Sequence, residues 1–188
     1  MSTTLSRIKS ATPIRSLLFW SLSFLAIPLA GYAGTFLVGR VDNPISALLG
    51  GAFVGAVIGI VQALVSRGRL PALTWTVATA IGLAAGVTLG TLAVGYGTSL
   101  VELAIGGVVT GAIVGLAQAI VLPAKRRWIW IAVTTILWPL AWSVTTLAGI
   151  KVDEQFIIFG ASGASVYTVL AGLVLLALRL PSAESATR

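Results

Sequence analysis

Six long stretches that are almost free of charge constrain this chain more than any other feature. Each has about 22–24 predominantly apolar residues, and a helix of that length crosses about 30 Å of hydrocarbon. Only 9% of the 188 residues are charged, 57% are hydrophobic, and the mean hydropathy is +1.04. Soluble domains carry about 25% charged residues. The sequence therefore predicts an all-α, polytopic membrane bundle that forms a single integral membrane domain over residues 1–188.

The expected spans begin and end at proline, glycine and capping residues. We expect them at about 15–38, 44–66, 71–94, 99–122, 128–148 and 155–178. Asn43 before Pro44 is typical of a helix start, and Ser99 with Glu102 predicts a capping box. Pro28 should kink the first span. That span is too long for the core of a cleaved signal peptide, so we expect it to remain in the membrane.

Lysine and arginine predict the orientation. Ten basic residues are expected on one side of the membrane, namely Arg7, Lys9, Arg15, Arg67, Arg69, Lys125, Arg126, Arg127, Arg179 and Arg188. Only Arg40 and Lys151 are expected on the other side. Cytoplasmic loops carry the excess of positive charge. We therefore expect a multi-pass protein of the plasma (inner) membrane with both termini in the cytoplasm.

A stripe of glycines followed by a glutamine occurs twice. The two copies are Gly51, Gly55, Gly59 and Gln62, and then Gly107, Gly111, Gly115 and Gln118, each residue 56 positions after its counterpart. Residues spaced by three or four share one helix face. Small residues on such a face let two membrane helices approach closely. We therefore predict that these glycines, together with Gly82, Gly86 and Gly90, pack helix against helix.

Three tryptophans extend the repeat to the whole chain. Trp20, Trp75 and Trp130 are spaced by 55 residues, which predicts three helical hairpins at about 14–68, 69–124 and 125–181. All three hairpins begin on the same side, so they are parallel repeats about an axis along the membrane normal. In the third hairpin Gly160, Ala164 and Thr168 take the small positions of the stripe.

Two hydrogen-bonded couples follow from this arrangement. An indole N–H only donates and an amide oxygen accepts, so we predict that Trp20 pairs with Gln62 and Trp75 with Gln118. In the third hairpin Trp130 faces Thr168 or Ala171 and lacks a glutamine. These residues either form a polar ring that binds a solute or lipid headgroup, or they hold helices together.

Trp138 and Trp142 are the remaining candidates for contact with a ligand or partner. They lie 56 residues after Gly82 and Gly86, so bulky side chains replace small ones. They could line a pocket, or they could fill a groove that glycine leaves elsewhere in the bundle.

Residues for catalysis are missing from the sequence. The chain has no cysteine and no histidine, and it shows no nucleophile–base pair, carboxylate dyad or phosphate loop. We expect no enzyme activity, no cofactor and no metal site. The net charge of +7 comes from basic residues in short turns, so we expect no nucleic acid partner.

The repeated Gly-x-x-x-Gly-x-x-Gln with a downstream tryptophan, as in Gly55–Gln62 with Trp75, resembles a loose group of small bacterial multi-pass membrane proteins without an assigned activity. The resemblance covers most of the chain and implies no substrate.

Two functions stay open. The first is an accessory or scaffold protein whose helices pack against other membrane proteins, or against itself. The second is an uncoupled channel or transporter for a small solute along the pseudo-threefold axis. Binding of membrane lipids is a third option, since basic turns attract anionic headgroups.

Overall fold

The computed structural model describes residues 13–151 and 156–178, and side chains from 14–151 and 160–178. The described residues are helical and contain no strand. The elements are α1 (Pro13–Leu22), η1 (Ser23–Leu25), α2 (Ala26–Val38), α3 (Pro44–Ser66), α4 (Ala72–Ala93), α5 (Leu100–Ala119), α6 (Ala124–Leu147) and α7 (Phe156–Ala177). Six spans are long and apolar enough to cross a membrane, the first made of α1, η1 and α2. This confirms the predicted class of fold. The basic residues predicted at 7, 9, 179 and 188 lie outside the described residues.

The first span is interrupted shortly before Pro28, the residue at which the sequence predicts a kink. The helix changes from α to 3₁₀ geometry over η1, which ends three residues before Pro28. Proline has no N–H for the carbonyl of Phe24, and its ring crowds that carbonyl. Pro139 lies inside α6, which continues through it as one α-helix.

Capping groups begin two of the helices. The Asn43 side chain accepts hydrogen bonds from the backbone N–H groups of Ile45 and Ser46 at 3.0 and 2.9 Å. The predicted capping box is present at α5, where the Ser99 N–H donates to the Glu102 carboxylate at 2.9 Å. The Glu102 carboxylate thus satisfies one backbone donor at the helix start, where a carboxylate is favoured.

Helix α6 begins at Ala124, four residues before the expected Trp128. Pro123 precedes the first helical residue, and proline fits a helix start because that N–H has no intrahelical partner. The Arg127 guanidinium donates to the carbonyls of Leu122 and Ile120 at 3.0 and 3.3 Å. The basic turn is therefore part of the helix and binds the end of α5.

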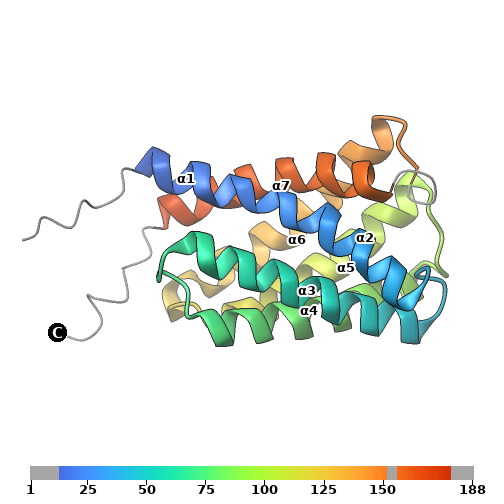
Figure 1. The fold of residues 1–188 in the computed structure, drawn as a ribbon, viewed down its shortest axis with the longest axis horizontal. Coiled ribbons are helices and arrows are strands. Elements are labelled where there is room, and N and C mark those ends of the chain that lie inside the picture. The colour runs from blue at the N-terminus through green and yellow to red at the C-terminus, as the bar shows by residue number, and fades with distance from the viewer. Residues whose placement is uncertain (1–12, 152–155, 179–188) are drawn as a thin grey trace, which may run out of the picture.

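The six spans form a closed ring. Each span contacts the span before and after it in the chain, and α7 returns to contact α1 and α2. Figure 1 shows the helices running side by side along one long axis, with α7 next to α1. Among the described residues, the backbones of non-neighbouring spans do not come close to one another. The ring therefore surrounds a central axis, and we refer to its two ends as the basic end (turns 67–71 and 120–123) and the opposite end (turns 39–43 and 94–99).

The predicted glycine stripes lie at helix–helix contacts. A Cβ added at Gly55 would stand 2.7 Å from the Ala80 Cα and from the Thr79 carbonyl oxygen of α4. Gly51 and Gly59 face α4 in the same way, the stripe at 107, 111 and 115 faces the backbone of α6, and the stripe at 82, 86 and 90 faces α5. In α7, Gly160 faces Pro28 with a Cβ-to-Cα distance of 3.1 Å. The threefold hairpin repeat itself stays a prediction.

Candidate functional site

Two glutamines and two tryptophans form hydrogen bonds inside the ring near the basic end. The Trp75 Nε1–H donates to Gln62 Oε1 at 3.0 Å, and the Trp130 Nε1–H donates to Gln118 Oε1 at 2.9 Å. All four side chains are at most 3% exposed. Each bond joins two helices that are consecutive in the chain across a turn of the basic end.

A threonine links the two couples. Gln118 Nε2 donates to Thr79 Oγ1 at 3.0 Å, and the Thr79 hydroxyl donates to the Trp75 carbonyl at 2.8 Å. The polar network therefore spans α3, α4, α5 and α6. Thr134 bonds the carbonyl of Trp130 in the same way at 3.0 Å, as expected for threonine inside a helix.

The predicted couples Trp20–Gln62 and Trp75–Gln118 are wrong. Each glutamine bonds the tryptophan of the following helix, because its glycine stripe packs that helix at close range. Gln62 and Trp75 lie at similar depths on the two sides of the turn at 67–71, so this pairing was also open from the sequence. The helix that the glycine stripe faces decides whether the glutamine bonds the tryptophan of the preceding helix or that of the following helix.

The tryptophan without a glutamine is Trp20, and the prediction that this would be Trp130 is wrong. Trp20 is 5% exposed, and its Nε1 has no hydrogen-bond partner among the described residues. It packs against α7, where a Cβ added at Gly172 would stand 2.6 Å from Trp20 Cδ1. Thr168 of α7 bonds the backbone carbonyl of Ser21 instead, at 3.3 Å. Ala171 is fully buried and offers no acceptor.

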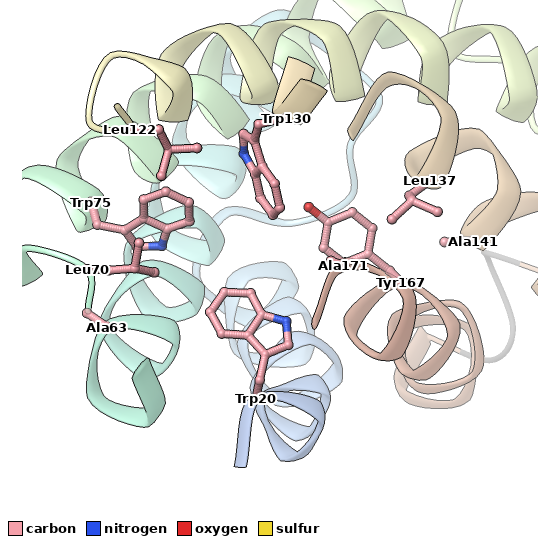
Figure 2. Packing of buried hydrophobic residues seen from close by; sticks show 10 residues of the cluster. All are labelled: Trp20, Ala63, Leu70, Trp75, Leu122, Trp130, Leu137, Ala141, Tyr167 and Ala171. Atoms are coloured by element: carbon pink, nitrogen blue, oxygen red, sulfur yellow. The ribbon is translucent and has the colours of Figure 1, made fainter. Parts of the chain in front are cut away.

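Aromatic side chains fill the centre of the helix ring next to this network. Trp75 and Trp130 lie with ring centroids 6.1 Å apart. Figure 2 shows Trp20 and Tyr167 converging on them from α1 and α7. Leu70 and Leu122 belong to the same buried cluster. The basic end of the axis is thus filled by side chains from the whole ring.

An axial cavity of about 70 Å³ lies against these residues. It receives side chains or backbone from all six spans: Ile27, Ile58, Gln62, Thr79, Leu83, Val114, Gln118, Trp138, Ala141, Trp142, Gly160, Gly163, Ala164 and Tyr167. Both glutamines of the polar network therefore line a space on the axis.

A second cavity, the vestibule, of about 250 Å³, continues toward the opposite end. It shares Ile27, Ile58, Leu83, Trp138, Trp142 and Gly160 with the axial cavity and extends to Val41 and Thr98 in the turns. Its lining is mostly apolar. The two cavities therefore adjoin, with the polar groups at the deeper end.

Trp138 and Trp142 fulfil both roles that the sequence left open. They line the two cavities and pack edge to face, with centroids 5.8 Å apart. Trp138 also fills space beside a glycine, since a Cβ added at Gly111 would stand 2.9 Å from its Cβ. Its Nε1 is buried and lies near the Tyr167 hydroxyl, with no hydrogen bond of good geometry to the described residues.

Arg67 and Arg69 line a separate cavity of about 720 Å³ at the basic end, between α1, α7 and the turn at 67–71. The Arg67 guanidinium lies 4.0 Å from the centre of the Phe19 ring, a cation–π contact. The described residues around the axial cavity and vestibule, in contrast, include no charged side chain.

Comparisons with protein-family models, with curated proteins and with solved structures find no match for this chain. The arguments for function therefore rest on the ring and its cavities.

Proposed function

We propose that this protein binds a small uncharged solute on the axis of the ring and lets it cross the membrane without ion coupling. The observation that carries this proposal is the axial cavity, which all six spans line and which contains Gln62 and Gln118. Polar groups are costly inside a membrane protein unless they bond to one another or to a substrate. Here they lie at the end of an apolar vestibule.

The charge of the lining favours an uncharged solute. A bare ion in an apolar cavity loses its hydration, and the uncharged residues around these cavities give no opposite charge to compensate. Coupled transport also uses ionisable groups near the membrane midplane. An amide, a hydroxyl and an indole are suited to a neutral molecule that forms hydrogen bonds.

Passage requires movement at the basic end, where Trp20, Trp75 and Trp130 fill the axis. The first span is the element suited to such movement. It is interrupted at η1, and 3₁₀ segments inside helices frequently mark hinges. Trp20 lies on α1, directly before this interruption, and its indole is not tied to the polar network.

Flux measurements test the proposal. Purified protein in liposomes should accelerate the entry of small neutral solutes such as urea or glycerol, measured by stopped-flow light scattering, and should not conduct Na⁺, K⁺ or Cl⁻. Gln118→Leu should abolish the protein-dependent flux if it still folds, and Leu64→Ala, a change at an exposed position of α3, should not. Equal rates with and without protein for every solute would contradict the proposal and favour the accessory role.

The orientation is a separate prediction. We propose that the basic end faces the cytoplasm of a bacterial inner membrane, so the vestibule opens to the outside. Reporter domains inserted at 40–43 and 95–99 should read as external, and one inserted at 67–69 should read as cytoplasmic. A cytoplasmic signal from either of the first two insertions would reverse the assignment.

A further inference from the structure

We propose that the axial cavity selects solutes by their hydrogen-bond acceptor, most simply a carbonyl oxygen, because side-chain N–H groups around it are left without a well-placed acceptor. This inference deepens the proposed function and rests on it for transport, although binding can be tested separately. Some polar atoms around the cavity already have a hydrogen-bond partner in the protein, and others are open to a ligand.

The tryptophans fix the orientation of both amides. An indole nitrogen can donate a hydrogen bond and cannot accept one. The amide group that faces it must therefore present its oxygen. Since Trp75 bonds Gln62 at 3.0 Å and Trp130 bonds Gln118 at 2.9 Å, each amide oxygen already accepts a bond inside the protein.

The two amide nitrogens differ in what they bond. Gln118 Nε2 donates to Thr79 Oγ1 at 3.0 Å. Thr79 in turn uses its own proton on the Trp75 carbonyl. Gln62 Nε2 has no such bond among the described residues, and Gln62 lines the axial cavity. Its N–H groups are therefore open to a ligand.

Trp138 supplies a second open donor. It lines both cavities, and its buried Nε1–H contacts the Tyr167 hydroxyl without forming a hydrogen bond of good geometry. Tyr167 lies beside it, with ring centroids 5.7 Å apart, and its hydroxyl can donate or accept. The balance of open side-chain groups is thus toward donation.

The sizes and linings of the two cavities limit the size and polarity of the ligand. The axial cavity of about 70 Å³ admits a polar group of a few atoms, while the vestibule of about 250 Å³ is mostly apolar. A neutral molecule with an exposed carbonyl oxygen satisfies Gln62 and Trp138 together. A molecule with a poor acceptor leaves both donors unpaired, and such a loss weakens recognition.

Urea and thiourea form the matched probe pair. They have the same shape, the same N–H donors and no charge, and they differ in the acceptor, since sulfur accepts hydrogen bonds weakly. In proteoliposomes the protein-dependent flux of urea should exceed that of thiourea by about fivefold, the effect of roughly one hydrogen bond. Gln62→Leu should bring the ratio close to one. Trp128→Phe, which removes an indole N–H at an exposed position of α6, should leave it unchanged.

Binding in detergent separates the two proposals. With ¹⁵N-labelled indoles, the Nε1–H resonance of Trp138 should shift on addition of urea and much less with thiourea, while those of Trp75 and Trp130, already bonded, should shift little. If urea shifts Trp138 without any flux, the proposed transport is wrong and the acceptor site stands. If flux occurs with equal rates for the two solutes, or if thiourea shifts Trp138 as strongly as urea, the acceptor selectivity is wrong.

Discussion

Gly55→Leu and Gly111→Leu are expected to destabilise the bundle by about 3 kcal/mol or more, at the upper end of the cost of overpacking. Both glycines face backbone atoms of the neighbouring helix. Backbone cannot move aside as a flexible side chain can, so a new side chain separates α3 from α4, or α5 from α6. Thermal unfolding in detergent, followed by circular dichroism, measures the loss.

A neighbouring pair of glycines gives the matched control. A Cβ at Gly51 would stand 2.6 Å from the Leu83 carbonyl oxygen, whereas at Gly50 it would meet only a Val38 methyl at 3.2 Å. Gly51→Ala should therefore lower the melting temperature. Gly50→Ala should leave it unchanged or raise it, since alanine favours a helix by about 1 kcal/mol over glycine. Equal effects at 50 and 51 would show that the contact with α4 does not decide stability.

Gly97 lies in the turn after α4, away from the helix–helix contacts, but it is unsuitable as a neutral control for the substitutions at Gly55 and Gly111. A Cβ there would overlap the Glu102 carboxylate, which bonds the Ser99 N–H. A substitution at Gly97 therefore disturbs the cap of α5. Its effect would report on that cap and not on helix packing.

Gln118→Leu is expected to cost about 2–6 kcal/mol, because two buried groups lose their partner at about 1–3 kcal/mol each. These groups are the Trp130 indole and the Thr79 hydroxyl. Gln62→Leu breaks only the bond with Trp75 and should cost about half as much. Chemical or thermal unfolding of each variant in the same detergent measures the difference.

A double-mutant cycle isolates the bond itself. Trp130→Phe removes the donor, so the cost of Gln118→Leu should fall when both changes are combined. The same cycle with Trp20→Phe in place of Trp130→Phe should be additive, since the Trp20 Nε1 bonds to no described residue. A coupling of zero between Trp130 and Gln118 would mean that the observed bond does not contribute to stability.

The sequence by itself determined the six spans, the capped starts of two of them and the positions of close packing. Apolar runs of this length must form helices in a membrane, because each backbone N–H and C=O must bond within its own segment. These two starts follow from local chemistry, at Asn43 and at Ser99 with Glu102. The stripe of Gly51, Gly55 and Gly59 marks a helix face regardless of what packs there.

Only the tertiary structure decided which residues bond across the helices. Gln62 lies at a depth similar to those of Trp20 and Trp75 on its two neighbouring helices, so spacing along the chain permits either pair. The rotation of α3, which points its glycine stripe at α4, selects Trp75 and leaves the Trp20 indole unpaired. The axial cavity is likewise invisible in the sequence, because it depends on how closely six helices approach one another around a common axis. Each distance depends on the glycine contacts between two successive spans. The cavity depends on all of these contacts together, so no single segment of the chain encodes it.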